Sequence, residues 1–376
     1  MVTRSSPTKR CPLSTRSFAA ITIWALAGIL SILPASAATQ ENNPTLTRLV
    51  SRLHSASDTP NIDAAVSTPD YSCTVSAGSD STSSQRPKRF HAASISKLFT
   101  AIVIMQLRDE GALSLQDRVG LYEPVFSFSP IRIEHLLTHT SGLRNRRRAK
   151  GRTTSEQVDA YIEALAKQRI SSSPGSSWRY SDAGFNLLGR VIERITNKQF
   201  SQTMKERILD PLGMRDSDFD LSRIPAQQRH RAYNKRGKAK THPWDRAFLP
   251  SSGLQTTAAD LAAFGNAVLS ISKGQPNPII TIESLEEMTT AKLPTAWTGV
   301  SQGYGWQLVN TSAHGPQWRH AGGEAGFEGL LTLYPMSHTT IAVLGNKKDW
   351  PRFELESEIR KRILLTPHLC EGGNGS

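Results

Sequence analysis

Short runs of apolar residues near both ends of the chain predict β-strands. Two such runs, 61–68 and 71–78, are separated by the turn signal Pro69-Asp70. Three more runs lie toward the other end of the chain, at 317–323, 326–335 and 339–346. The last two are expected to form a hairpin, because only a short polar segment separates them.

Between these strands the apolar positions follow the spacing of helices. Residues 94–111 are apolar on most sides, which predicts a buried helix that ends at Gly111. Four further helical patterns follow, at 154–168, 183–197, 203–214 and 256–270. Two more flank the strands, at 43–56 and 353–365.

Strands at both ends and helices in the middle predict an α/β (α+β) fold built from two parts. Residues 38–93 and 301–376 would form an α/β sheet domain. Residues 94–300 would form a mostly helical domain that interrupts it. The sequence contains no internal repeat of structural length.

The first 37 residues have the pattern of a signal peptide. A basic leader without acids precedes the apolar run 18–33, and small residues place a cleavage site after Ala37. The alternative is an uncleaved membrane anchor, but the run is short for a spanning helix. We therefore expect cleavage, no integral membrane association afterwards, and a periplasmic or secreted protein.

The chain has 376 residues and a formal net charge of +13, and loss of the four cations of the leader would leave +9. Part of the remaining excess is concentrated in Arg144–Arg152. No basic helix with interleaved aromatics and no zinc-spaced Cys/His set accompanies this run, so we expect no nucleic-acid partner. The run is either a solvated loop or a patch that attracts an anionic cell envelope or an acidic substrate.

Two cysteines, Cys73 and Cys370, would remain after cleavage. An oxidising compartment would allow a disulfide between an early strand and the C-terminal tail. Two cysteines so far apart in sequence say little about geometry, so the sequence leaves this pairing open. They have no metal-site spacing, and we expect neither a metal nor an organic cofactor.

The tetrapeptide SISK occurs twice, at Ser94–Lys97 and at Ser270–Lys273. Ser-x-x-Lys spacing lets a lysine amine reach a serine hydroxyl one helical turn away, which can make the serine a nucleophile. The first copy opens the buried helix, where free backbone N–H groups favour developing negative charge. The second copy is followed by Gly and Pro, where a helix cannot continue. A third Ser-x-x-Lys lies in the leader, so the first copy is the candidate.

Two downstream motifs supply what a serine–lysine hydrolase also needs, a further proton-transfer group and a strand edge. Tyr180-Ser181-Asp182 is the only Tyr-x-Asn/Asp in the chain and precedes a helical pattern. His320-Ala321-Gly322-Gly323 is the only His-x-Gly and begins a predicted strand. Each residue alone would more often be structural, and only the ordered set indicates a site. No Gly-x-Ser-x-Gly occurs, so an α/β-hydrolase elbow does not compete.

These motifs, in this order, resemble those of the serine penicillin-recognising family. The branch most similar to this chain holds class C β-lactamases, D-alanyl-D-alanine carboxypeptidases, D-aminopeptidases and related esterases. The resemblance extends from about Ala64 to Asn346 and includes the segments 133–143, 174–196, 210–219, 251–264 and 303–308. It implies the β-lactamase/transpeptidase-like fold, with an antiparallel sheet flanked by helices and interrupted by a mostly helical domain.

The resemblance also implies roles for the candidate residues. Ser94 would attack a carbonyl and form an acyl-enzyme, and Lys97 and Tyr180 would share the proton transfers. Which of the two is the base stays open at the level of sequence. The backbone N–H groups of Ser94 and Gly323 would hold the oxyanion, and Gly322 and Gly323 would let the substrate approach the strand.

Two substrate-binding positions depart from the pattern of β-lactamases. The family often has Asn where this chain has Asp182, and an ionised Asp lacks the amide donor and would favour a protonated Lys97. β-Lactamases usually have Lys where this chain has His320, and a neutral His binds a carboxylate less strongly. Both departures argue against an efficient β-lactamase. His135 and His139, in a matching segment, are expected to be hydrogen-bonding scaffold residues.

The substrate implied by the resemblance is a small molecule or peptide, in the first place a D-amino-acid peptide of the cell wall or a related amide. Esters are the alternative, since Tyr-Ser-Asp is also similar to certain esterases. An alternative of another class is a penicillin-binding sensor, which acylates without turnover, or an inactive homologue. We expect a monomer.

Overall fold

The computed structural model describes residues 45–78, 86–146, 155–242, 244–271, 274–275, 277–311, 315–365 and 369–370. The predicted signal peptide and most of the basic run Arg144–Arg152 lie outside the described residues. Residues Pro44–Ser376 form one compact unit. No helix among the described residues is both long and apolar enough to cross a membrane.

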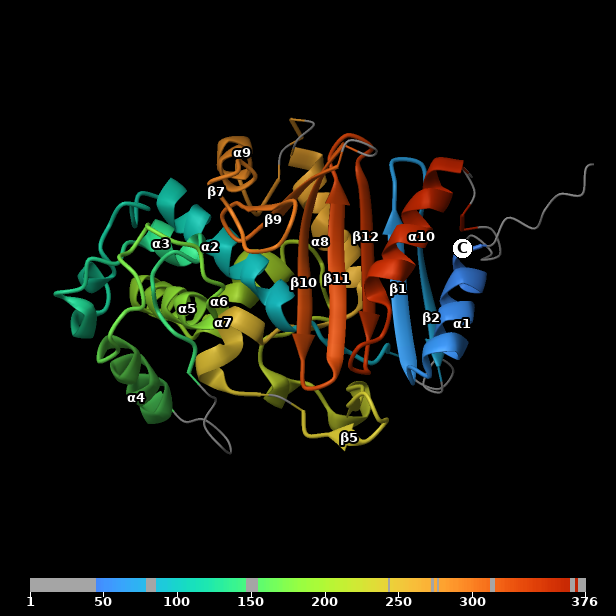
Figure 1. The fold of residues 1–376 in the computed structure, drawn as a ribbon, viewed down its shortest axis with the longest axis horizontal. Coiled ribbons are helices and arrows are strands. Elements are labelled where there is room, and N and C mark those ends of the chain that lie inside the picture. The colour runs from blue at the N-terminus through green and yellow to red at the C-terminus, as the bar shows by residue number, and fades with distance from the viewer. Residues whose placement is uncertain are drawn as a thin grey trace, which may run out of the picture. The chain divides into compact units, whose positions relative to one another are not determined.

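An eight-stranded antiparallel sheet organises the unit, with the strand order β2-β1-β12-β11-β10-β9-β8-β7 (Figure 1). Its strands are β1 Asn61–Ser67, β2 Ser72–Gly78, β7 Leu293–Pro294, β8 Val300–Gln302, β9 Gln307–Thr311, β10 Gly315–Glu324, β11 Phe327–Tyr334 and β12 Thr339–Gly345. All five strands expected from the sequence are present. The three that were not expected, β7 to β9, are short and carry no extended apolar pattern.

Helices cover both faces of the sheet and fill the region beside it, which confirms the predicted fold class (Figure 1). They are α1 Leu46–Ser57, α2 Ser96–Asp109, α3 Ile133–Leu137, α4 Ser155–Ala166, α5 Asp182–Thr196, α6 Phe200–Met204, α7 Leu249–Ser252, α8 Ala258–Ile271, α9 Ile282–Met288 and α10 Arg352–Leu365. Two small two-stranded pairs, β3 (Phe90–His91) with β6 (Gln255–Thr256) and β4 (Ala232–Tyr233) with β5 (Ala239–Lys240), lie outside the main sheet.

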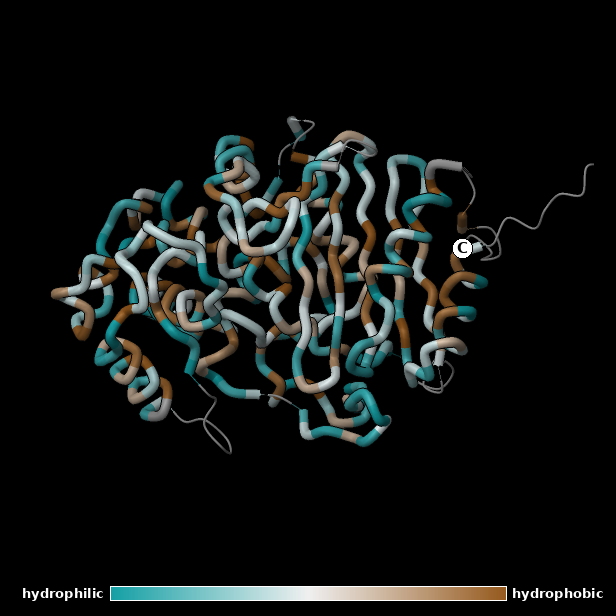
Figure 2. The backbone as a smooth tube through the Cα atoms, viewed as in Figure 1, coloured by the Kyte–Doolittle hydropathy of each residue, from teal (hydrophilic) through white to brown (hydrophobic). Residues whose placement is uncertain are grey.

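The central strands are buried on both faces because each face has its own hydrophobic core. Along β12, Ile341 and Val343 belong to the core under α1 and α10, whereas Ala342 and Leu344 belong to the larger core around α2, α5 and α8. Successive strand residues point to opposite faces, so an unbroken apolar run is what such a strand requires. In Figure 2 the outer helices α1 and α10 instead mix hydrophobic and polar residues, as a solvent-facing layer should.

A disulfide joins Cys73 on β2 to Cys370, with 5.9 Å between the two Cα atoms. The adjacent residue Leu369 also accepts a hydrogen bond from the backbone N–H of Leu46, the first residue of α1. The end of the described chain is therefore fastened to both β2 and α1. The sequence left the pairing of these two cysteines open, and in the structure they form a disulfide.

Candidate active site

Ser94 and Lys97 lie on consecutive helical turns at the centre of the molecule. Ser94 is in the short 3₁₀ turn Ala93–Ile95, which runs directly into α2. Residues three apart in such a turn lie on one side of it, and the Lys97 Nζ donates a hydrogen bond to the Ser94 Oγ at 3.2 Å. Ala93, the residue before Ser94, has a φ of 48°, a left-handed conformation that costs energy without glycine.

Lys97 is fully buried and all its donors are directed at acceptors. Besides Ser94, its amine donates to the Oδ1 of Asp182 at 2.7 Å and to the carbonyl oxygen of Ser251 at 2.8 Å. Burial lowers the pKa of Lys97, but the Asp182 carboxylate and Tyr180 raise it by more, so the net shift is upward. Lys97 is therefore an ammonium group at neutral pH, as the presence of Asp182 led us to expect.

Tyr180 faces the same pair of residues. Its ring centroid lies 4.9 Å from the Lys97 Nζ. Burial raises the pKa of Tyr180, Lys97 lowers it, and Asp182 raises it again, with a net shift upward. The phenol therefore carries its proton in the resting site, and the positive charge beside it is what eases removal of that proton.

Asp182 is the first residue of α5, where the free N–H groups of the helix favour a carboxylate. The Oγ of Ser181 caps this helix by accepting from the N–H of Gly184 at 3.1 Å. The second carboxylate oxygen of Asp182 accepts from the Nδ2 of Asn145 at 3.4 Å, and the Oδ1 of Asn145 accepts from the N–H of Ala183 at 3.1 Å. Asn145 thus fixes the orientation of Asp182.

His320 is buried on β10 and neutral. Burial and the nearby Lys97 lower its pKa to about 3, against a weaker effect of the Ala321 carbonyl. Its Nδ1 lies 2.8 Å from that carbonyl oxygen, so Nδ1 carries the proton and Nε2 offers a lone pair. The expected weakness of His320 toward a carboxylate follows from this neutrality.

The two glycines of the third motif have different reasons to be glycine. A Cβ on Gly322 would lie 2.1 Å from the carbonyl oxygen of Ala92, so this glycine lets β10 pack against the turn that holds Ser94. A Cβ on Gly323 would meet nothing nearer than 3.8 Å. Of the two, only Gly323 leaves room for a side chain beside the strand, whereas Gly322 is also required by packing; a role of either glycine in substrate approach stays a prediction.

Ser94, Tyr180 and the end of β10 open onto a cleft of about 920 Å³. Strand β9 pairs with β10 only as far as Arg319, so in the described structure residues 320–323 lie beyond this pairing. Trp297 lines the cleft with 42% of its surface exposed, and its ring lies 5.7 Å from that of Tyr180 and 4.9 Å from that of Trp178. The cleft thus offers a strand edge and an aromatic wall.

The second SISK segment has a local structural explanation. Helix α8 ends at Ile271, as predicted, and Lys273 lies outside the described residues. The Ser270 Oγ donates to the carbonyl oxygen of Ala267 at 2.8 Å and accepts from the Nδ2 of Asn277 at 3.3 Å. This serine fastens the end of α8.

His135 and His139 make the scaffold contacts that were expected of them. The Nδ1 of His135 accepts from the N–H of Arg132, and the Nδ1 of His139 accepts from the N–H of Ser181, both at 3.1 Å. The His139 ring also packs against that of Tyr180, with 4.5 Å between centroids. His139 therefore supports both the phenol and the cap of α5.

Comparison with known proteins identifies relatives for this arrangement. Residues 73–365 match the model of the Beta-lactamase family. Penicillin-binding protein 4* of Bacillus subtilis is 27% identical over 293 residues, which are 70% of this chain and 62% of that protein, so the chain spans less than two thirds of this relative.

Two solved structures share the fold at lower identity. An octameric penicillin-binding protein homologue from Pyrococcus abyssi aligns with a TM-score of 0.73 and 24% identity, over 86% of this chain and 78% of that one. A β-lactamase/D-alanine carboxypeptidase from Pseudomonas syringae aligns with a TM-score of 0.71 and 19% identity, over 85% and 98%.

Proposed function

The chain belongs to the Beta-lactamase family of serine hydrolases, and from this premise we propose that it forms an acyl-enzyme on Ser94 and hydrolyses D-amino-acid peptides or related amides. One observation carries the proposal: the buried ammonium of Lys97 bridges the Ser94 Oγ at 3.2 Å and the Asp182 carboxylate at 2.7 Å, at the end of an open cleft. An exposed ion pair would be weak evidence for a catalytic site. A buried ion pair in contact with a hydroxyl group is expected where a serine is activated as a nucleophile.

Tyr180 is the base in this proposal, and Lys97 keeps its proton. For Ser94 to attack, the Lys97–Tyr180 pair must first lose one proton, leaving either a neutral amine or a phenolate. The Asp182 carboxylate, 2.7 Å from the Lys97 Nζ, favours the state with the proton on the amine. The phenolate of Tyr180 then takes the Ser94 proton as the Oγ bonds to the substrate carbonyl carbon.

The carbonyl oxygen becomes an oxyanion in this step, and the N–H groups of Ser94 and Gly323 would stabilise it. The bond to the leaving amine or alcohol breaks next, and Tyr180 returns the proton to that group. Water then attacks the acyl-enzyme and gives a proton to Tyr180, which passes it to the Ser94 Oγ as the ester bond breaks, so that Ser94 and the phenolate are regenerated. These steps need no metal or organic cofactor.

The neutral His320 and the aromatic wall favour a substrate whose reacting end is not held through a strong carboxylate contact. A peptide could add to β10 at residues 320–323, beyond its pairing with β9, and place an apolar group against Trp297. Because no fixed cation stands at position 320, an ester of the same shape is the second candidate substrate.

We also propose that the protein is exported to the periplasm or secreted after cleavage behind Ala37, and that it works as a monomer. The apolar run 18–33 supports export, and so does the Cys73–Cys370 disulfide, since such bonds persist in oxidising compartments.

The test combines labelling with turnover. Wild type and Ser94→Ala would be treated with a fluorescent penicillin and assayed on a D-Ala-D-Ala peptide, nitrocefin and p-nitrophenyl butyrate. We expect peptide hydrolysis by wild type, weak nitrocefin turnover, and neither labelling nor turnover by Ser94→Ala. Ser270→Ala is the matched control and should keep full activity.

Each of the other outcomes would indicate a different function. Stable labelling without turnover of any substrate would indicate a penicillin-binding sensor, and turnover of the ester alone would indicate a carboxylesterase. Full activity of Ser94→Ala would refute the assignment of the nucleophile. A folded wild type that neither labels nor turns over would indicate an inactive homologue.

A further inference from the structure

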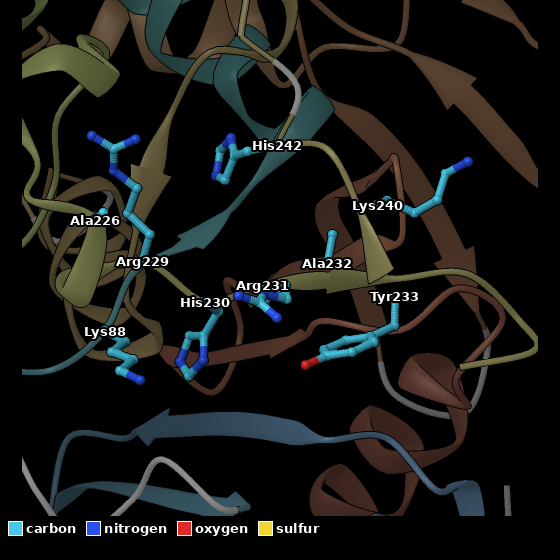
Figure 3. Close-up of a pocket in the computed structure, with 9 residues that line it drawn as sticks. All are labelled: Lys88, Ala226, Arg229, His230, Arg231, Ala232, Tyr233, Lys240 and His242. Carbon is cyan, nitrogen blue, oxygen red and sulfur yellow. The ribbon is translucent and has the colours of Figure 1, made fainter. Parts of the chain in front are cut away.

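A second cavity, of about 460 Å³, lies beside the active-site cleft (Figure 3). Lys240 lines both cavities, so the two are neighbours. The second cavity, which we term the basic pocket, is lined by Lys88, Ala226, Arg229, His230, Arg231, Ala232, Tyr233, Lys240 and His242.

Among the described residues that line the basic pocket, cations are frequent and carboxylates are absent. Four of its nine residues are Lys or Arg, two are His, and none is Asp or Glu. The guanidinium of Arg229 donates to the carbonyl oxygens of Leu221 and Ile224, and among the described residues no acid forms an ion pair with it. Arg89, by contrast, is buried and paired with Asp216 at 3.1 Å.

The pocket is built on a backbone that is fastened at several points. Most of it comes from residues 229–242, a segment with six Lys or Arg and no acid, which contains the β4–β5 pair. The N–H of His230 donates to the carbonyl oxygen of Arg89 at 3.0 Å, and the N–H of Tyr233 donates to that of Asn346 at 2.8 Å. The cations are therefore held in a defined place.

Figure 3 shows how the side chains lie. The ends of Lys88, Arg231 and Tyr233 lie around the ring of His230, whereas the amine of Lys240 and the guanidinium of Arg229 lie at the periphery. The donors thus come from two separate segments and approach one space from different sides. A planar carboxylate is satisfied by one arginine fork, but a tetrahedral group with three free oxygens can use donors from several directions.

We propose that the basic pocket binds a phosphate group of an anionic ligand. Lys and Arg side chains and a phenol can all donate to phosphate oxygens, and none of the described lining residues is a carboxylate that would repel them. The cavity is larger than one phosphate needs, so the group belongs to a larger molecule. Because Lys240 borders both cavities, that molecule extends from the basic pocket toward the active-site cleft.

Isothermal titration of the whole protein with inorganic pyrophosphate tests this site. We expect one saturable site per chain, whose affinity falls as NaCl rises from about 50 to 200 mM, because the contacts are ionic. The double variant Lys88→Ala/Arg231→Ala should bind at least about tenfold more weakly, since it removes two charged donors from the site. Binding should not depend on Ser94, so Ser94→Ala should match wild type whatever its activity.

The matched control removes the same charge elsewhere. Lys167→Ala/Lys361→Ala deletes two exposed lysines on other surfaces, each paired with a glutamate of its own helix region, and should leave the affinity unchanged. Arg231 is exposed, so the single variant Arg231→Glu keeps the test available if the double variant does not fold. Absence of saturable binding, equal weakening in the control, or binding of citrate as tightly as pyrophosphate would each overturn the proposal.

Discussion

A single carboxylate determines where the protons lie in the candidate site. Asp182 raises the pKa of both Lys97 and Tyr180, although it forms a hydrogen bond only with the amine. An asparagine at this position would keep a similar shape and a contact with Asn145 but would remove the negative charge. Asp182, one of the two residues that depart from the pattern of β-lactamases, is therefore the one that controls when the Lys97–Tyr180 pair loses a proton.

Asp182→Asn should move the pH dependence of acylation toward acid. Both raised pKa values fall when the carboxylate is removed, so the pair loses its proton at lower pH, by about one pH unit or more. The measurement is the rate of labelling by a fluorescent penicillin between pH 5 and 10. The control is Asp159→Asn, which removes a carboxylate of α4 that is paired with Arg190 and should leave the profile unchanged. An unchanged or alkaline-shifted profile would contradict the role given to Asp182.

His320 should make the protein sensitive to acid. Its pKa falls from an ordinary 6.5 in the unfolded chain to about 3 in the folded protein. Between these two pH values, therefore, the unfolded chain binds a proton at His320 and the folded protein does not. The contribution of His320 to the free energy of unfolding is fully present above pH 6.5 and is lost progressively toward pH 3. Between pH 7 and pH 5 this loss should be about 2 kcal/mol. Urea unfolding at the two pH values measures this loss. His139 is buried with a pKa shifted the same way and should add to it.

The comparison of two variants isolates the contribution of His320. His320→Gln should lose less stability between pH 7 and pH 5 than wild type does. His54→Gln, which alters a partly exposed histidine on α1, should show the wild-type loss. Equal losses in wild type and His320→Gln would mean that His320 is not neutral in the folded protein.

At the level of elements, the site depends on how closely β10 approaches the turn that carries Ser94. Gly322 faces the Ala92 carbonyl at a distance that excludes any side chain, while Ala93 adopts a left-handed φ of 48° in the same turn. Close contact and backbone strain thus coincide at the junction of two elements. The sequence motif His-x-Gly marks this packing contact as much as it marks a binding edge.

Gly322→Ala and Gly323→Ala should differ strongly. The methyl group at 322 would lie 2.1 Å from a backbone oxygen, so β10 or the Ser94 turn must move, with a loss of stability and of most activity. The methyl group at 323 finds space and should leave the midpoint of urea unfolding nearly unchanged. Unfolding curves and acylation rates of both variants give the comparison. Similar behaviour of the two would show that the contact at Ala92 does not matter.

Over the whole molecule, long patterns were predictable and single contacts were not. Helix α2 and strands β10 to β12 were expected because their apolar runs persist over many residues. The contact of Ser251 with Lys97 could not be predicted from the sequence, because Ser251 accepts the hydrogen bond through a backbone carbonyl that any residue would supply. Asn145 was interpreted only as part of a basic run, since its contact with Asp182 arises when a loop meets α5.

The disulfide between Cys73 and Cys370 is the feature that sequence spacing left open, and it should stabilise the fold without affecting catalysis. It fastens the chain end to β2, and strands β1, β12 and β11 lie between β2 and the site strand β10. Loss of the bond should therefore lower the free energy of unfolding by roughly 2–5 kcal/mol, because the unfolded chain regains the freedom that the cross-link removes. Urea unfolding with and without a reductant measures this effect in wild type, and Cys73→Ser/Cys370→Ser should show the lower stability with no response to reductant. The acylation rate per folded molecule should be the same in both proteins.

Two outcomes would contradict a purely stabilising role of the disulfide. If the stability of the wild type did not change with the reductant, the cross-link would be absent in solution. If the folded double variant had lost activity, the cross-link would be coupled to the site across three strands.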